Sequence, residues 1–163
     1  MKVTLRPEDP DSDAEFVKRV IIETLAVELG AAAWPEPLRG QLLTMQYETR
    51  RQGARAREAG ESKVIEANGE GAGWLFFARL EDELHLSEIM VLPEFRGRGI
   101  GAEAVRQVMA LAEGKPVGLF VNVLNVGAIK LYERLGFQRI GGTEVQHEMQ
   151  ARTDREIGPR DLV

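Results

Sequence analysis

The chain has 163 residues, of which 44% are apolar and 29% are charged, and its formal net charge is −5. These values predict one globular domain with a sizeable core. The acidic balance argues against a nucleic-acid-binding protein, which needs a basic surface. The chain contains no cysteine, which excludes disulfides, thiolate zinc sites and a cysteine nucleophile.

The start of the chain and its apolar runs bear on where the protein works. Met1–Leu5 lacks the pattern of a signal peptide, and no apolar run approaches the roughly 20 residues that cross a bilayer. We therefore expect a cytoplasmic protein with no membrane partner. His85 and His147 are the only histidines, too few for a histidine metal site, so we expect no metal.

The first half of the chain alternates strand and helix patterns. Phe16, Val20, Ile21 and Leu25 recur at helical spacing. Asn68-Gly69 is typical of the tight turn of a β-hairpin. The expected elements are a strand at Lys2–Arg6, helices at about Asp13–Leu29 and Leu38–Ala59, a break at Gly60–Ser62, and strands at Lys63–Ala67 and Gly73–Leu80.

The second of these helices carries a row of arginines on an otherwise acidic protein. The simplest interpretation is a solvated helix face. The alternative is that the arginines line the path of an anionic ligand. The residues concerned are Arg50, Arg51, Arg55 and Arg57.

The chain is organised around Leu84–Gly101, whose pattern predicts a strand, a glycine-rich turn and the start of a helix. Pro93 ends the strand because it cannot donate a ladder hydrogen bond. Glycines permit positive φ and close approach to the backbone. The helix that follows offers unpaired N–H groups and a partial positive charge at its first turn. The stretch therefore predicts a site for a phosphate or pyrophosphate.

The rest of the chain predicts a second alternation of helix and strand. The continuous apolar run from Val117 to Val123 favours a strand buried on both faces, and Asn125 is typical of a helix N-cap. The other expected elements are helices at Ala102–Glu113 and Asn125–Leu135 and a hairpin of Phe137–Ile140 and Glu144–Met149. We expect a single domain over residues 1–151 and a polar tail over residues 152–163.

A dinucleotide-binding fingerprint competes for the same glycines, since Gly97, Gly99 and Ala102 have its spacing. Three features disfavour a nucleotide-dependent redox enzyme. Pro93–Arg96 separate the first glycine from its strand, no acidic residue stands about 20 residues further on, and the preceding strands form an antiparallel meander.

Two motifs together resemble the GNAT superfamily of N-acetyltransferases. Arg96-x-x-Gly99-x-Gly101, after a strand ending in Val91-Leu92-Pro93, is similar to that family's acetyl-CoA signature. Asn125, Ala128 and Leu131-Tyr132-x-x-x-Gly136-Phe137 follow in the family's order. The resemblance covers about Gly73–Met149. It implies an α/β (α+β) fold with a mixed, mostly antiparallel seven-stranded sheet and helices on both faces.

The resemblance also implies that acetyl-CoA is the cosubstrate. The strand backbone would pair with its pantetheine arm, and the loop and helix tip would hold its pyrophosphate through main-chain N–H groups. Asn125 would contact the same molecule, although a plain N-cap explains it as well. The implied binding residues are Ile89, Met90, Val91, Arg96, Gly97, Arg98, Gly99, Ile100, Gly101, Ala102 and Asn125.

Tyr132 matches the family's general acid, because a phenol with a pKa of about 10 can protonate a departing thiolate. Glu88, which interrupts an apolar strand, is the candidate general base that takes the proton of the attacking amine. The structural alternatives are a core tyrosine on an amphipathic helix and an outward-facing strand glutamate. For each of the two residues, the sequence leaves both the catalytic and the structural interpretation open.

The resemblance implies an enzyme that moves an acetyl group from acetyl-CoA to a primary amine by direct attack in a ternary complex. The alternative is a domain that binds and senses acyl-CoA without turnover. The acceptor would be a small-molecule amine or a peptide. Leu119–Val121 lacks the glutamate that other members of the family carry on this strand, and this departure argues against acetylation of protein N-termini. Members of the family often form homodimers. The expected wall of the acceptor site is Trp34, Tyr47, Arg50 and Arg51.

Overall fold

The computed structural model describes residues 1–55 and 60–153 and contains a seven-stranded sheet in the order β1-β2-β3-β4-β5-β7-β6. Every neighbouring pair is antiparallel except β4 and β5, which run parallel. The strands are β1 (Val3–Pro7), β2 (Gly60–Ala67), β3 (Glu70–Arg79), β4 (Leu84–Val91), β5 (Val117–Asn122), β6 (Gln138–Gly142) and β7 (Gln146–Ala151).

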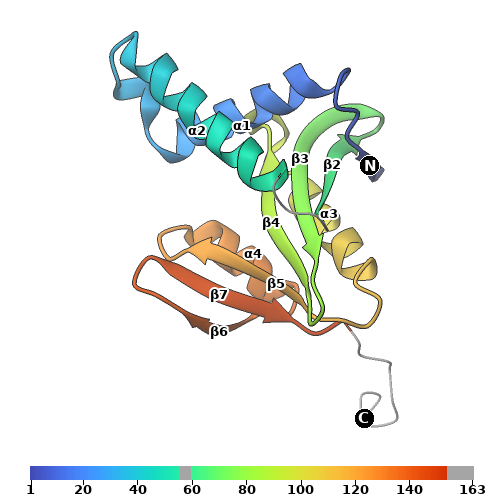
Figure 1. Ribbon diagram of the computed structural model, residues 1–163. Coiled ribbons are helices and arrows are strands. Elements are labelled where there is room, and N and C mark those ends of the chain that lie inside the picture. The colour runs from blue at the N-terminus through green and yellow to red at the C-terminus, as the bar shows by residue number, and fades with distance from the viewer. Residues whose placement is uncertain (56–59, 154–163) are drawn as a thin grey trace, which may run out of the picture.

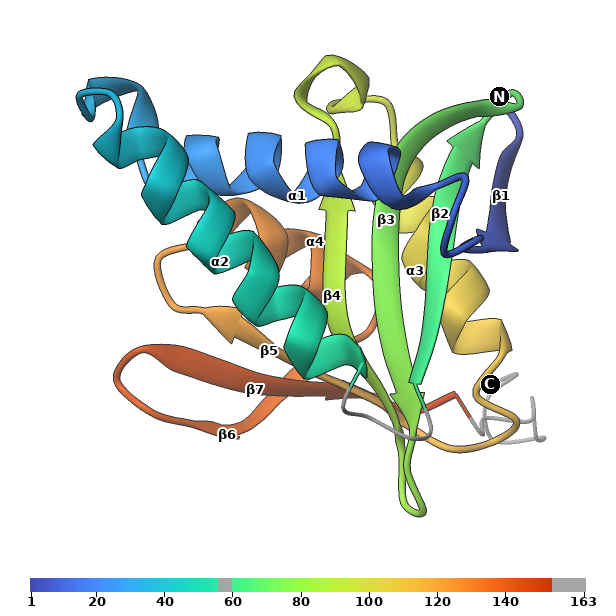
Figure 2. The same cartoon turned by 45° about the horizontal axis from the view of Figure 1, so that its top comes forward.

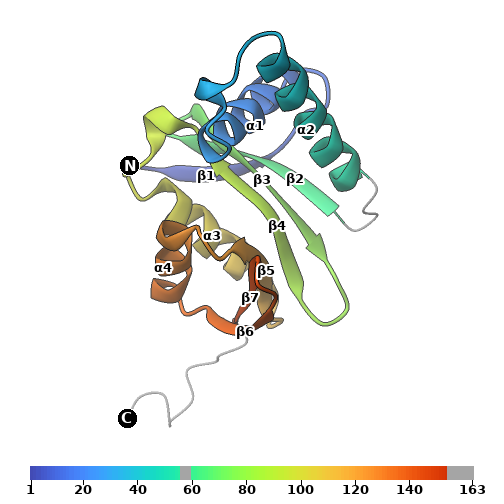
Figure 3. The same cartoon turned by 90° about the vertical axis from the view of Figure 1, so that its left-hand side faces the viewer.

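Four α-helices cover the sheet from both sides among the described residues. Figure 1 and Figure 3 show α1 (Ala14–Glu28) and α2 (Leu38–Arg55) on one face, and α3 (Ile100–Ala110) and α4 (Val126–Arg134) on the other. Short 3₁₀ helices, η1 (Ala31–Ala33) and η2 (Pro93–Phe95), follow α1 and β4. The predicted mixed, mostly antiparallel seven-stranded fold is therefore confirmed.

The hydrophobic pattern places the core between these layers. In α1, Val17, Ile21 and Leu25 are buried at intervals of four residues, which points one face of the helix at the sheet. Trp74 and Phe77 of β3 are fully enclosed. β3 lies in the middle of the antiparallel half of the sheet, so its side chains meet helices on both faces.

Two predicted strands differ from the structure. β2 begins at Gly60, so Gly60–Ser62 does not break the pattern but extends the strand opposite β3. The prediction that the fifth strand is buried on both faces is wrong, because Phe120 is 52% exposed. Figure 3 shows why: α1 and α2 lie over β2–β4 and leave this face of β5 uncovered.

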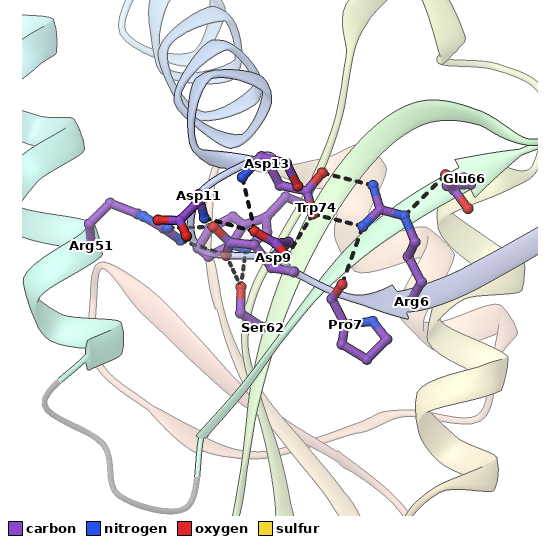
Figure 4. Close-up of polar contacts among 11 residues, drawn as sticks. Arg6, Pro7, Asp9, Asp11, Asp13, Arg51, Ser62, Glu66 and Trp74 are labelled. Atoms are coloured by element: carbon purple, nitrogen blue, oxygen red, sulfur yellow. Dashed lines mark hydrogen bonds and ion pairs between the residues drawn. The ribbon is translucent and has the colours of Figure 1, made fainter.

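A buried polar network fixes α2 against the sheet. Both terminal nitrogens of Arg51 donate to the carboxylate of Glu8, at 2.6 and 3.0 Å, and the ring of Trp74 lies 5.6 Å from the guanidinium carbon. Ser62 donates to the same carboxylate and accepts from Trp74 Nε1 at 2.7 Å. Figure 4 shows Arg51 reaching from α2 towards Ser62 and Trp74.

This network corrects the interpretation of Arg51 as part of a solvated face or of the acceptor wall. Arg51 is only 8% exposed and is committed to Glu8. A charge is retained in such a place only when it is paired and hydrogen-bonded. Arg57 and the side chain of Arg55 lie outside the described residues.

Arg51→Ala should destabilise the fold by about 3–5 kcal/mol, because the substitution leaves the buried carboxylate of Glu8 unpaired. Urea denaturation measures the change. Arg39→Ala is the matched control, since Arg39 is also in α2 but pairs with Glu36 at the surface, and it should cost about 1 kcal/mol or less. Equal effects of the two substitutions would contradict the structural role of the network.

Candidate functional site

The parallel strands β4 and β5 pair only at their beginning. Leu84 lies opposite Val117 and His85 opposite Gly118, and no further residues of the two strands pair. β4 continues to Val91 beside β3, while β5 turns to β7. Figure 2 shows the two strands diverging. Residues 87–91 therefore form a strand edge that β5 does not cover, and such an edge offers backbone groups to another extended chain.

The first turn of α3 lies at the end of this open edge. Gly97 and Gly99 have φ of +77° and +80°, a conformation that L side chains rarely adopt, and a Cβ at either position would meet no atom within 4 Å. Gly101 lies between Val91 of β4 and Leu131 of α4, at 3.9 and 4.0 Å from its ideal Cβ. The backbone at the tip of α3 is therefore approachable.

These features fit the pyrophosphate of a CoA molecule. The N-cap of α3 is Gly99, so no side chain caps the helix, and the N–H groups of a first helical turn attract anions. Ile100 and Ala102 belong to this turn. The residues present thus fit acetyl-CoA: the bare helix tip is suited to a phosphate group, and the strand edge is suited to an extended polar arm.

The two arginines of the loop turn back towards η2 and β4. Arg96 donates from Nε to the carbonyl oxygen of Val91 at 3.0 Å. Arg98 donates to the carbonyl of Glu94 at 3.1 Å and stacks near Phe95. Through these contacts both side chains stabilise the shape of the loop.

Helix α4, which packs beside the tip of α3 through Leu131, carries Asn125 at its N-cap and Tyr132. The side chain of Asn125 accepts a hydrogen bond from the N–H of Ala128 at 3.2 Å, which confirms it as the N-cap. Tyr132 is 7% exposed and its ring lies 5.5 Å from that of Phe137. Its hydroxyl makes no hydrogen bond within residues 1–55 and 60–153.

Tyr132 of α4 lies within electrostatic reach of Glu88 of β4. Burial, and after it the negative charge of Glu88, raise the pKa of Tyr132 to about 12. The phenol therefore keeps its proton throughout the neutral range. Tyr132 packs against the core, as its structural interpretation predicts, and it also lies within electrostatic reach of Glu88. Its role as the general acid stays a prediction.

Glu88 projects towards α2 and meets Arg50. Nη1 of Arg50 lies 2.9 Å from each carboxylate oxygen, and the two side chains are 31% and 23% exposed. The sequence placed Arg50 near the acceptor but gave no sign that it pairs with Glu88. Residues 38 positions apart meet only through the packing of α2 on the sheet, so no local pattern could have revealed the pair.

The other residues expected in the acceptor wall make contacts elsewhere. Trp34 follows η1 and packs, partly buried, against the core. Tyr47 lies beneath Lys18 of α1, with the ammonium 5.7 Å from the ring centre. Of the four predicted wall residues, Arg50 is the one that the structure places beside a candidate catalytic group.

The face of the sheet that carries Glu88 continues into a hollow. His85 pairs with Ala78 and Glu88 with Phe76, and a bulge between these pairs keeps both β4 side chains on the α2 side. The hollow measures about 240 Å³. Its lining includes Glu83, His85, Phe120, Ile140 and Glu148.

No helix in residues 1–55 or 60–153 is long and apolar enough to cross a membrane. Within the same ranges, no group of three or more His, Cys, Asp or Glu side chains is placed to hold a metal ion.

The family model described as "Acetyltransferase (GNAT) family" matches residues 22–137, which include the strand, loop and helices of the site. The chain therefore belongs to the GNAT acetyltransferase family, whose members use acetyl-CoA.

Curated relatives agree over part of their length. The chain is 36% identical over 85 residues to an uncharacterized N-acetyltransferase of Methanocaldococcus jannaschii, covering 46% of this chain and 38% of that protein. It is 41% identical over 59 residues to the N-alpha-acetyltransferase RimI of Mycobacterium tuberculosis, covering 36% and 37%. The chain thus spans well under half the length of these relatives.

Solved structures share the fold over nearly the whole chain. The PaiA N-acetyltransferase of Thermoplasma acidophilum, solved in complex with coenzyme A, has a TM-score of 0.74 at 15% identity, covering 93% of this chain and 99% of that one. An acetyltransferase of Thermus thermophilus has a TM-score of 0.71 at 17% identity, covering 93% and 97%. At these identities the likeness shows the fold.

The pKa of Tyr132 is open to direct measurement. Because the folded pKa of about 12 exceeds the unfolded value of about 10, folding favours the neutral phenol, and this stabilisation is complete below about pH 10 and lost as pH rises towards 12. Up to about pH 10.5, the tyrosinate absorbance of folded wild type and folded Tyr132→Phe should match, because Tyr132 stays protonated there. A difference in tyrosinate absorbance between the two folded proteins with its midpoint near pH 10 would contradict the raised pKa of Tyr132.

Proposed function

We propose that the protein is an N-acetyltransferase that moves an acetyl group from acetyl-CoA to a primary amine by direct attack in a ternary complex. One observation carries the proposal: the uncovered edge of β4 lies beside the bare tip of α3, and Tyr132 on the neighbouring α4 keeps its proton within electrostatic reach of Glu88. Family membership supports the same reaction class. The single domain over residues 1–151, the cytoplasmic location and the homodimer remain predictions.

The proposed binding residues lie along the edge of β4 and at the tip of α3. Ile89, Met90 and Val91 would pair with the pantetheine arm through their main chain. Gly97 to Ala102 would hold the pyrophosphate with main-chain N–H groups, and Asn125 would contact the cosubstrate from α4. Arg96 and Arg98 would add positive charge, which strengthens the attraction for phosphate.

The proposed catalytic roles of Tyr132 and Glu88 are a proton donor and a proton acceptor. Acetyl-CoA supplies a thioester, whose cleavage by an amine releases a thiolate. Tyr132 holds a proton at its hydroxyl oxygen and would donate it to that thiolate. The acceptor amine must lose a proton to attack, since alkylamines are mostly protonated at pH 7. Glu88 would take this proton, directly or through water, from the α2 side of the sheet.

Tyr132→Phe should lower kcat about 10²–10⁴-fold, because it removes the general acid. Release of CoA thiol from acetyl-CoA with a panel of amines measures the rate. The dissociation constant of acetyl-CoA, measured by calorimetry, should change little, since the hydroxyl is the only group removed. An unchanged kcat would refute the role of Tyr132.

The same assay separates the enzyme from a domain that binds acyl-CoA without turnover. If wild type binds acetyl-CoA but releases no thiol with any amine of the panel, the sensing domain is correct. If wild type binds neither acetyl-CoA nor CoA, the whole assignment of the α3 tip fails. A nicotinamide nucleotide serves as the negative control for the binding arm.

Glu88→Gln should change the pH dependence of the reaction. Without a base, the rate should depend on the fraction of acceptor amine that is already neutral, and kcat/KM should rise about tenfold per pH unit up to the pKa of the amine. The kcat/KM of wild type should rise less steeply with pH between about pH 6 and 8. Parallel profiles for the two proteins would show that Glu88 is not the base and that a water chain serves instead.

A further inference from the structure

The hollow beside β4 is lined by two carboxylates from different parts of the chain. Glu83 belongs to the turn before β4, and its carboxylate lies over Gly118 of β5, where a Cβ would collide with it. Glu148 of β7 lies opposite Phe120 of β5 in the sheet. Within residues 1–55 and 60–153, the side chain of Glu148 makes no hydrogen bond or ion pair. The hollow therefore has negative charge that those residues do not neutralise.

His85 adds a further hydrogen-bond acceptor to the hollow. Its Nδ1 lies 3.2 Å from a carboxylate oxygen of Glu83. Because an ionised carboxylate only accepts, Nδ1 is the donor of this pair, and a neutral imidazole then presents Nε2 as an acceptor. His85 is 9% exposed, and its Nε2 makes no hydrogen bond within the described ranges but keeps contact with solvent. A ligand that satisfies these three groups must bring N–H donors and positive charge.

Apolar side chains form much of the accessible wall of the hollow. Leu80, Phe120 and Ile140 all line it and are 43%, 52% and 55% exposed. The rings of Phe120 and His85 lie 5.2 Å apart. Covering such surface with methylene groups is favourable, and an aromatic ring attracts a nearby cation. The wall therefore suits an alkyl chain that ends in an ammonium group.

Strand β4 connects the hollow with the proposed reaction centre. His85 and Glu88 point to the α2 side of the sheet and are three positions apart. A strand advances about 3.3 Å per residue, so roughly 10 Å separate the two positions. A molecule whose amine reacts beside Glu88 can thus reach the hollow with a second group at the other end of a short alkyl chain.

We propose that the acceptor is an aliphatic amine with a second ammonium group, as in diamines and polyamines, and that the hollow binds this distal ammonium between Glu83, Glu148 and Nε2 of His85. This inference rests on the proposed acetyl transfer and names its acceptor class. An alkylammonium keeps its charge at neutral pH, and its three N–H donors match the three acceptors.

The distal ammonium is unchanged by the reaction. At the other end, the C–N bond of the amide forms as the C–S bond of the thioester breaks. The amine gives up one proton, which Glu88 would take, and the departing thiolate receives the proton of Tyr132. The hollow therefore acts in binding and orientation, away from the reacting atoms.

Other occupants fit the hollow less well. An amino acid would bring its carboxylate towards Glu83 and Glu148, which repel it. A monoamine covers the apolar wall but leaves Glu148 without a partner. A second copy of this chain that covered Phe120 and Ile140 would bury the charge of Glu148 without a cation, which is costly.

The test compares diamines with monoamines. Release of CoA thiol from acetyl-CoA is measured for a series of α,ω-diamines of increasing chain length, each beside the n-alkylamine of the same length. In wild type the kcat/KM of the best diamine should exceed that of its monoamine at least about tenfold, as expected for a charge-assisted hydrogen bond. The preference should peak at the chain length that spans roughly 10 Å and should weaken in high salt.

Glu148→Gln should lower the ratio of the two kcat/KM values about tenfold, mainly through the KM of the diamine, and Glu83→Gln should lower it too. Glu144→Gln is the matched control, because Glu144 lies in the turn of the same hairpin, exposed and outside the hollow, and it should keep the wild-type ratio. Calorimetry with CoA-loaded protein should show diamine binding that weakens about tenfold in Glu148→Gln. The dissociation constant of CoA, measured in parallel, shows that each variant is folded.

The outcomes separate the two proposals. If wild type acetylates monoamines as well as diamines, or prefers amino acids, the inference about the hollow is overturned while acetyl transfer stands. A diamine preference that survives in both glutamine variants of the hollow also overturns it. So does a Phe120→Ser protein that changes from dimer to monomer in sedimentation but keeps the preference, since the hollow would then be an interface between copies. If wild type binds no CoA, or releases no thiol with any amine, the proposed function fails, and the acceptor inference fails with it.

Discussion

The structure depends on one interruption of backbone pairing, the separation of β4 from β5 after two residue pairs. A sheet normally satisfies the N–H and C=O groups of its inner strands through both neighbours. Here β4 keeps one neighbour over its second half, so part of an inner strand behaves as an edge. The tip of α3 stands at one end of this edge, where Gly101 approaches Val91, and α4 flanks it through Leu131.

The same separation explains the two environments of the candidate site. On the side of α3 and α4, backbone groups and glycines predominate, which suits a polar and phosphorylated ligand. On the side of α2, charged side chains predominate, and Arg50 and Glu88 face each other while both remain partly exposed. Tyr132 is nearly enclosed between these environments, and its burial keeps the phenol protonated. A protonated phenol and a carboxylate are thus brought near the tip of α3.

Stability and the site are connected through α2. Arg51 is used for structure and Arg50 points to the site, although the two are neighbours in the sequence. The buried pair of Arg51 and Glu8 stabilises little in itself, because the desolvation of both charges offsets their attraction. Its consequence is positional: breaking the pair would leave a charge buried and would free the helix that presents Arg50. The network therefore helps to hold Arg50 where it meets Glu88.

The sequence by itself determined the elements, their order and the motifs of the α3 tip and α4, because these depend on local patterns: apolar periodicity, Pro93 after a strand, glycines before a helix and Asn125 as a cap. It could not determine the exposure of Phe120, the burial of Arg51 or the meeting of Arg50 with Glu88. Each of these depends on which helix covers which part of the sheet. Tertiary packing decided them, since residues 38 or more positions apart are joined by the fold and not by any local preference.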